Sequence, residues 1–230
     1  MHILLVAPAG ANDIDNQMVR EVPYLRSRAL FGPHAVVTVA ALTPEEDDVA
    51  IHDEHMHGPV ERHLEHATYD VVGVSLTTNQ YNRALQIARY CKQHAPATTT
   101  VAGGIGAQNL MHATQSPFDV VIYGEAENSW PQFISDVRKG QHAPVYTCYA
   151  HPDLTKAPTP RWDLIASDIG SYGTLSVQTT RGCPHDCSFC DVIYTYGRRP
   201  RSKSVEQVLQ EICALQRLGA KIAEDLEEIV

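Results

Sequence analysis

Val71-Val72-Gly73-Val74-Ser75 decides the fold class, because it is a short apolar run that ends in a small polar residue. A strand that is apolar at successive positions is buried on both faces, as in parallel sheets covered by helices. Residues 81–94 follow with helical periodicity. The apolar face of this predicted helix holds Ala84, Leu85, Ala88 and Cys91.

The same alternation extends to both sides of this strand. Further strands are predicted at residues 3–6, 49–51, 98–101 and 120–123, and helices at residues 36–42, 109–114 and 130–139. This order predicts an α/β fold, with a Rossmann-like, doubly wound parallel sheet covered on both faces. Ligands of such sheets bind at the carboxyl ends of the strands. Those ends carry Gly10, Ser75, Thr77, Gly103, Gly104, Gly124 and Glu125.

The chain is predicted to have two parts joined by a connector. Residues 1–139 form the α/β domain, and residues 140–171, with four prolines, form the connector. Residues 172–230 begin a second domain, with an alternating apolar stretch at 174–179. A helix is predicted over residues 204–218, capped by Ser204 with Gln207 three residues later and ended by Gly219.

Composition excludes several classes of protein. The 230 residues include 43% hydrophobic residues, which excludes general disorder. A net charge of −9, from 18 basic and 27 acidic side chains, argues against nucleic-acid binding. No apolar run approaches the roughly 20 residues that a membrane helix needs. The start of the chain lacks the basic lead of a secretory signal, so a cytoplasmic location is expected.

Three of the six cysteines, Cys183, Cys187 and Cys190, form a C-x3-C-x2-C cluster. Thiolates suit iron–sulfur clusters or zinc. Three cysteines on one loop can bind three corners of a cubane and leave one iron open. A structural zinc site needs a fourth ligand. His185 would supply it only with awkward geometry, so zinc, or no metal, is the weaker alternative.

The run from Arg181 to Cys190 resembles the signature of the radical S-adenosylmethionine (radical SAM) superfamily, C-x3-C-x-aromatic-C, with Phe189 at the aromatic position. The resemblance implies a 4Fe-4S cluster held by Cys183, Cys187 and Cys190. It also implies S-adenosylmethionine on the open iron and beside Phe189, and the start of a (β/α) barrel. An electron from the cluster would cleave the sulfonium and yield a 5′-deoxyadenosyl radical. The expected partner is an electron donor such as flavodoxin or ferredoxin.

The N-terminal half looks like the cobalamin-binding domain that precedes the barrel in one subgroup, closest to the hopanoid methylases. The matching runs are residues 72–75, 102–104, 123–127, 160–164 and 196–203. The resemblance implies methyl transfer to an unactivated carbon of a small-molecule or lipid-like substrate. The cobalamin contacts it implies are Ser75, Thr77, Gly103, Gly104, Gly124 and Glu125. Residues 9–16 contain no histidine, so cobalamin would not be histidine-ligated from this loop.

Each supporting feature also has a simpler interpretation. Gly103-Gly104 alone would be an ordinary turn, Ser75 a helix cap, and Gly124-Glu125 a loop. The histidine-rich residues 52–66 are predicted to form a solvated loop rather than a metal site, although the resemblance places Asp53-Glu54 at the end of the second strand. The basic run 198–203 is predicted to be a solvated loop near the cluster. Cys91 and Cys213 are predicted to pack on apolar helix faces.

Length limits what the chain is expected to do alone. Only 40 residues follow Cys190, and residues 222–230 resemble a helix rather than the second barrel strand. The chain is therefore expected to be truncated within the barrel, which leaves enzyme activity open. The alternatives are a non-catalytic cobalamin and iron–sulfur binding module, and a zinc-stabilised α/β regulatory protein.

Overall fold

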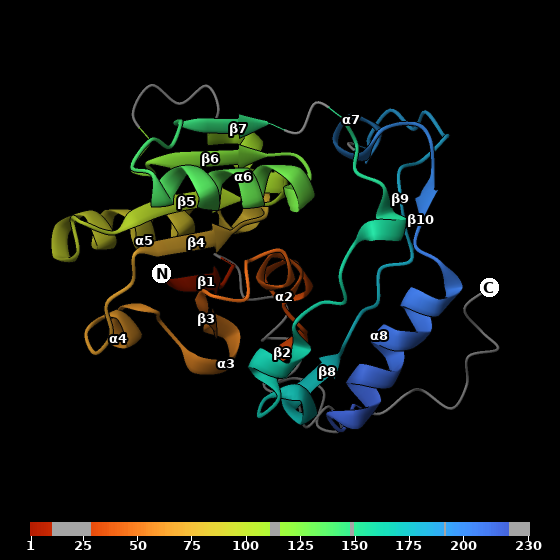
Figure 1. The fold of residues 1–230 in the computed structure, drawn as a ribbon, viewed down its shortest axis with the longest axis horizontal. Helices are drawn as coiled ribbons and strands as arrows, with labels where there is room; N and C mark the ends of the chain where they lie inside the picture. Colours follow the sequence, from red (N-terminus) through yellow and green to blue (C-terminus); the bar gives the residue numbers. More distant parts are fainter. Residues whose placement is uncertain (11–28, 111–115, 148–149, 191, 221–230) are drawn as a thin grey trace.

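A six-stranded parallel sheet forms the centre of the computed structural model, which describes residues 1–10, 29–110, 116–147, 150–190 and 192–220 (Figure 1). Its strands are β1 (His2–Ala7), β3 (Asp48–Asp53), β4 (Val71–Ser75), β5 (Thr99–Gly103), β6 (Val120–Tyr123) and β7 (Val145–Thr147). They lie in the order β3-β1-β4-β5-β6-β7, and every pair is parallel. The predicted doubly wound α/β fold is confirmed.

Helices cover both faces of the sheet because the strands are apolar on both. Val72 and Val74 of β4 pack toward α5 (Tyr81–His94), whereas Val71 packs in the opposite cluster with α2 (His34–Ala41) and α6 (Ala126–Arg138). The short helices α3 (Glu54–His57) and α4 (Glu61–Leu64) follow β3, and the 3-10 turns η1 (Thr78–Gln80) and η2 (Ile105–Leu110) follow β4 and β5.

Helix α5 has the bounds expected from its periodicity. Its buried residues are Ala84, Ile87, Ala88 and Cys91. Burial raises the pKa of the Cys91 thiol to about 11, which keeps it protonated at neutral pH. Cys91 is therefore a packing residue, as predicted.

Smaller elements follow the sheet and lie beside the ends of its strands (Figure 1). They are η3 (Leu154–Lys156), η4 (Trp162–Ile165), η5 (Ile169–Ser171), β8 (Tyr172–Thr174), β9 (Thr180–Arg181), α7 (Val192–Tyr196), β10 (Arg201–Ser202) and α8 (Val205–Arg217). Strand β8 pairs with β2 (Ala29–Phe31), and β9 pairs with β10 as an antiparallel ribbon. A third apolar cluster joins the two parts of the chain, because Trp162 and Leu215 pack with Val37 of α2.

Helix α8 begins as its sequence predicts. Ser204 accepts a hydrogen bond from the Gln207 backbone, and the Gln207 side chain accepts one from the Ser204 backbone. Gly219 follows with φ +90°, a conformation that favours glycine. No helix in the described part of the chain is both long and apolar enough to cross a membrane.

Several boundaries differ from the sequence predictions. Strand β7 extends the sheet into residues 140–171. Helix α6 begins at Ala126 rather than at Trp130, and its first turn was missed because that turn is polar and lacks an apolar pattern. Residues 105–110 form a 3-10 turn where a helix from residue 109 was expected, and 111–114 lie outside the described residues. Of the stretch 174–179, only Thr174 belongs to a β-strand. Cys213 is exposed, which contradicts its predicted packing role. Cys148 and residues 222–230 also lie outside the described residues.

A buried ion pair anchors α8 to the end of β10. Lys203 Nζ lies 2.8 Å from Glu211 Oε2, and the two side chains are 7% and 1% exposed. We expect Lys203→Met to lower the free energy of unfolding by about 3–5 kcal/mol, because it leaves a carboxylate buried without its partner. Urea unfolding measures this loss.

The exposed pair Arg161–Asp163 offers a matched control, since its side chains are 44% and 56% exposed. We expect Arg161→Met to change the free energy of unfolding by only about 0–1 kcal/mol. Equal losses in the two variants would contradict the importance of burial.

Candidate functional site

The sheet has a topological switch point between β1 and β4. From β1 the chain moves outward to β3, and then crosses back to β4, β5, β6 and β7 on the other side. Crevices at the carboxyl ends of such strands are the usual ligand sites of open α/β sheets. The structure therefore directs attention to the loops after β1, β4, β5 and β6.

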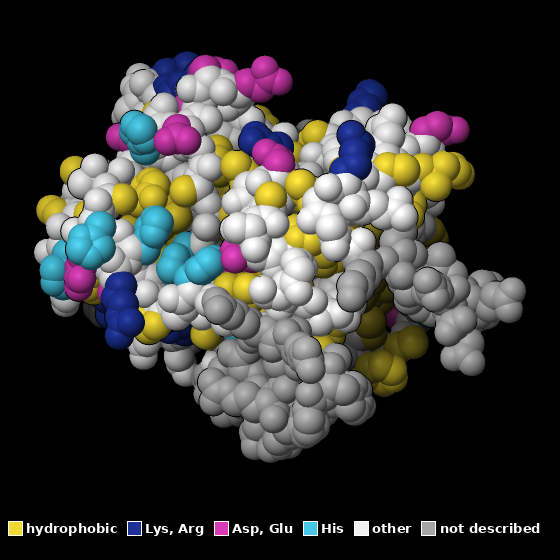
Figure 2. Space-filling view, turned by 90° about the horizontal axis from the view of Figure 1, so that it is seen from below, with side chains coloured by type: hydrophobic (Ala, Val, Ile, Leu, Met, Phe, Trp, Pro, Cys, Tyr) yellow, Lys and Arg dark blue, Asp and Glu magenta, His cyan; other side chains and the backbone are white. Residues whose placement is uncertain are grey.

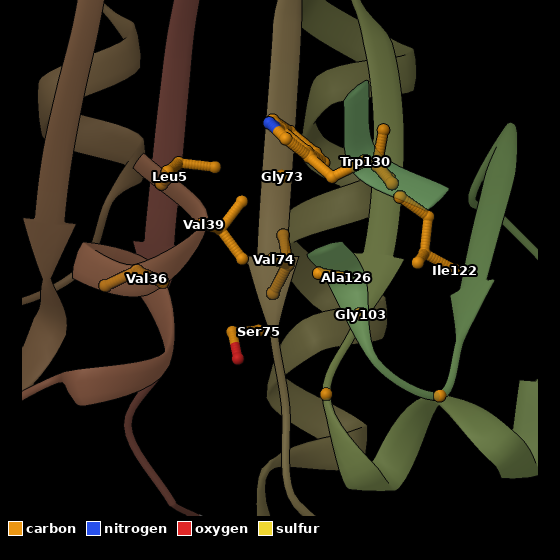
Figure 3. Close-up of a pocket in the computed structure, with 13 residues that line it drawn as sticks. Leu5, Val36, Val39, Gly73, Val74, Ser75, Gly103, Ile122, Ala126 and Trp130 are labelled. Carbon is orange, nitrogen blue, oxygen red and sulfur yellow. The ribbon is translucent and has the colours of Figure 1, made fainter. Parts of the chain in front are cut away.

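An apolar cavity of about 50 Å³ lies at this edge, between the sheet and helices α2 and α6 (Figure 3). Four of the predicted site residues line it: Ser75, Gly103, Gly104 and Gly124. Sequence reasoning missed others, among them Leu5, Val36, Val39, Gly73, Ala126 and Trp130. Gly73 could have indicated the cavity from sequence alone, because a glycine inside a buried strand often marks a place where a ligand or another backbone approaches closely.

Glycines keep this cavity open. A Cβ added to Gly103 would have no heavy atom within 4 Å, so only a hydrogen faces the space there. Gly104 has φ +87°, and its Cβ would lie 2.7 Å from Leu76 O, so a side chain is excluded. An added Cβ on Gly73 would lie 2.9 Å from Leu5 Cδ2. An apolar recess with a glycine wall suits the flat aromatic base at the end of cobalamin's nucleotide tail.

Thr77 lies outside this cavity. It caps η1, where its N–H donates to Gln80 Oε1 at 2.9 Å. Gln80 Nε2 in turn donates to Pro8 O at 2.6 Å, which joins the loops after β4 and β1. Thr77 and Ser75 both line a neighbouring hollow, so Thr77 stays at the same edge of the sheet.

Glu125 follows β6 and is buried within a group of basic side chains. Arg201 and Arg181 donate to its carboxylate at 2.7 Å each, and His151 Nδ1 lies 2.7 Å from it. Burial acts to raise the pKa of Glu125, but these hydrogen bonds outweigh it and hold the pKa below its ordinary value. Glu125 is therefore ionised at neutral pH. Its predicted contact with cobalamin stays a prediction.

The three predicted cluster ligands lie on the loop between β9 and α7. Cys183 donates its backbone N–H to Gly197 O at 3.1 Å, and Cys190 donates to Cys187 O at 3.1 Å. All three thiols are free, Cys187 is exposed, and Phe189 is 90% exposed. In the described ranges, no three His, Cys, Asp or Glu side chains converge to hold one metal ion. Ligands of an iron–sulfur cluster bind different irons and need no such convergence, so the donor set fits a cluster.

The prediction of a solvated loop for the basic run 198–203 is wrong for two of its members. The side chains of Arg201 and Lys203 are 18% and 7% exposed, because each pairs with a buried carboxylate. Arg198 is exposed and pairs with Asp186 of the cysteine loop at 2.8 Å.

The prediction of a solvated loop for residues 52–66 is also wrong in part. His52, Asp53 and Glu54 are buried, since β3 continues to Asp53 and α3 begins at Glu54. Glu54 pairs with Arg83, 29 residues away. Figure 2 shows several histidines gathered on one face of the molecule. The rings of His52 and His63 lie 5.3 Å apart.

Comparisons with known proteins agree with both parts of this site. A family model for the B12 binding domain matches residues 29–134, and one for the radical SAM superfamily matches residues 177–223. These matches cover the cavity residues of β4, β5 and β6 and all three clustered cysteines. The chain belongs to the cobalamin-binding radical SAM proteins. This family carries cobalamin, S-adenosylmethionine and a 4Fe-4S cluster, which favours the cluster over zinc.

Several relatives of this chain are methyltransferases. It is 32% identical to an uncharacterized methyltransferase of Synechocystis sp. over 84% of this chain and 35% of that protein. It is 27% identical to the hopanoid C-2 methylase of Rhodopseudomonas palustris, over 84% of this chain and 36% of that protein. The predicted similarity to hopanoid methylases is confirmed. The chain thus spans about a third of the length of these relatives.

A solved structure shares the fold. The radical S-adenosylmethionine methyltransferase TsrM from Kitasatospora setae, with tryptophan substrate and a SAM analog bound, superposes with a TM-score of 0.61. The match covers 95% of this chain and 46% of that chain at 16% sequence identity, so it supports the architecture alone.

The buried carboxylates predict a dependence of stability on pH. For Glu211, burial acts to raise the pKa, but nearby Lys203 and His34 bring it below the ordinary value of 4.5. A lowered pKa in the folded state means that the stabilisation is present above pH 4.5 and is lost as the pH falls through the lowered pKa. Thermal unfolding of wild type and Glu211→Gln should differ most at pH 7. The difference should shrink below pH 4.5, and a constant difference down to pH 3 would contradict this assignment.

Proposed function

We propose that this chain forms the cofactor-binding part of an enzyme that transfers a methyl group to an unactivated carbon. This proposal depends most on one observation: a loop that lines the apolar cavity is bonded to the strand that leads into the cysteine loop. Gly124 lines the cavity, and the next residue, Glu125, is bonded to Arg181, two residues before Cys183. An enzyme that uses two cofactors in one reaction needs them fixed near each other.

The roles of the residues follow from their chemistry. Cys183, Cys187 and Cys190 would hold the cluster, and Phe189 would lie beside S-adenosylmethionine. Ser75, Gly103, Gly104 and Gly124 would receive cobalamin. When bound, the reduced cluster would supply the electron that cleaves S-adenosylmethionine, and cobalamin would carry the methyl group.

Partners follow from the same chemistry. A small-molecule or lipid-like substrate is proposed because the related methylases are named for such molecules. A flavodoxin or ferredoxin is proposed as the electron donor. A cytoplasmic location is proposed because exposed cysteines of this kind persist in reducing compartments. The methyltransferases among the relatives match both parts of the chain, which favours this enzyme over a non-catalytic binding module.

The cluster is tested by anaerobic reconstitution of the chain with iron and sulfide. We expect a brown wild-type protein, and Cys187→Ala should lose most of the colour and iron because one corner of the cubane lacks its thiolate. Cys213→Ala is the matched control, since Cys213 is also exposed but lies on α8. Full iron content in Cys187→Ala, or a colourless wild type that binds zinc, would contradict the assignment.

Cobalamin binding is tested by filling the cavity at Gly103. We expect Gly103→Val to lower the affinity for hydroxocobalamin about tenfold or more, roughly 1.4 kcal/mol, in a spectral titration. The melting temperature should stay close to that of wild type, because the added Cβ meets no atom within 4 Å and valine is favourable in a β-strand.

Gly170→Val provides the control for this titration. Gly170 also has no heavy atom within 4 Å of its added Cβ, and it lies in η5, outside the cavity. Equal affinities of Gly103→Val and wild type would remove the cavity from the proposed cobalamin site. Failure of the wild type to bind cobalamin would overturn the proposed function.

A further inference from the structure

The β9–β10 ribbon is anchored at both ends by buried acids. Arg181 of β9 and Arg201 of β10 reach Glu125 beside the sheet, whereas Lys203, just after β10, reaches Glu211 of α8. The two strands are also joined through their backbones. Arg201 lies opposite Arg181 in the antiparallel ladder, and the Lys203 N–H donates to Thr179 O at 2.9 Å. The ribbon leads directly into the cysteine loop, so its position sets where that loop begins.

Basic side chains surround the carboxylate of Glu125 on both of its oxygens. A carboxylate offers about four acceptor positions. Oε1 receives Arg201 Nη2 and lies beside His151 Nδ1, both at 2.7 Å. Oε2 receives Arg181 Nη1 at 2.7 Å and Arg201 Nη1 at 3.0 Å. The carboxylate of Glu125 is therefore engaged by its basic neighbours.

Close backbone packing carries the position of Glu125 to the first cysteine. Gly182 has φ +94°, and a Cβ there would lie 2.5 Å from Arg199 O, so the loop fits tightly against the stretch before β10. A Cβ on Gly197 would lie 2.6 Å from His151 Nε2, and Gly197 O accepts the Cys183 N–H. Cys183 thus contacts Gly197, which packs against His151, and His151 in turn contacts Glu125 directly.

We propose that Glu125 is a positioning residue that fixes the cysteine loop at the cobalamin edge of the sheet. Its neighbours in sequence, Gly124 and Ala126, line the cavity, and its carboxylate clamps the two arginines of the ribbon. The inference rests on the proposed function, because that function requires a fixed distance between the two cofactors and Glu125 would set that distance. Removing the negative charge loosens the ribbon at this end, where Arg181 keeps its ion pair with Glu127 but Arg201 loses its charged acceptor.

The test measures the distance between the two cofactors. The full chain is reconstituted anaerobically with iron, sulfide and hydroxocobalamin and then reduced, and pulsed electron paramagnetic resonance measures the separation of the cluster and cob(II)alamin. Wild type should give one narrow distance maximum. Glu125→Gln should keep its iron content and lose that narrow maximum in the protein that binds cobalamin.

A second variant and a control make the test specific. Arg201→Lys keeps the charge and loses the guanidinium fork, so it should broaden the distribution even where Glu125→Gln fails to fold. Asp119→Asn removes an ion pair with Lys92 at the opposite edge of the sheet and should keep the narrow maximum. Any of the three substitutions can change the thermal stability, but only the two that weaken the contact between Glu125 and Arg201 should broaden the distance.

The outcomes separate this inference from the proposed function. A narrow maximum in both Glu125→Gln and Arg201→Lys overturns the positioning role, and so does equal broadening in Asp119→Asn. A wild type that binds both cofactors with a broad distribution also overturns the positioning role alone. A wild type that lacks either cofactor overturns the proposed function itself.

Discussion

Neutralisation of buried charge is the constraint on which the arrangement of the two parts depends. An ionised carboxylate is costly to bury unless donors replace the water it loses. Glu125 and Glu211 are 4% and 1% exposed, and neither finds its cationic partners within its own element. Their partners come from β9, β10 and the residue after β10. The same requirement that satisfies the two acids therefore ties the cysteine loop to the sheet.

Backbone conformation adds a second constraint at the carboxyl edge. Parallel strands bring their carboxyl ends to one side, and the crossover from β3 to β4 leaves a crevice there. Whether that crevice stays open depends on residues without side chains. Gly103 leaves space beside it, and Gly104 turns the chain with a positive φ that brings it close to the Leu76 backbone. Larger residues at these positions would close the recess or move the loop.

Much of the fold was predictable from local patterns. The apolar run Val71–Ser75 and the periodic face of residues 81–94 each depend on residues close together in the chain, and both elements have the predicted bounds. The cysteine cluster was also recognisable from the sequence, because its three members lie close together in the chain. Strand β7 was missed because its three residues are defined by pairing with β6 rather than by their own pattern.

Other features could not be predicted because they depend on contacts between distant residues. Arg201 appears as a member of a basic run, and only the fold brings it to Glu125, 76 residues earlier. Lys203 is likewise buried by its pair with Glu211. The apolar walls of the cavity, such as Val36 and Trp130, come from helices whose facing surfaces no local pattern distinguishes from ordinary core.

The cysteine loop combines a fixed stem with a tip that stays open to solvent, and this contrast follows from the chemistry proposed for it. Cys183 is held by Gly197 O, while Cys187 and Phe189 lie exposed. A cluster that must receive an electron and bind a sulfonium substrate needs an open iron, so the ligands around it cannot all be buried in protein. Precision in its position must then come from the stem. The buried group around Glu125 supplies that precision without covering the ligands.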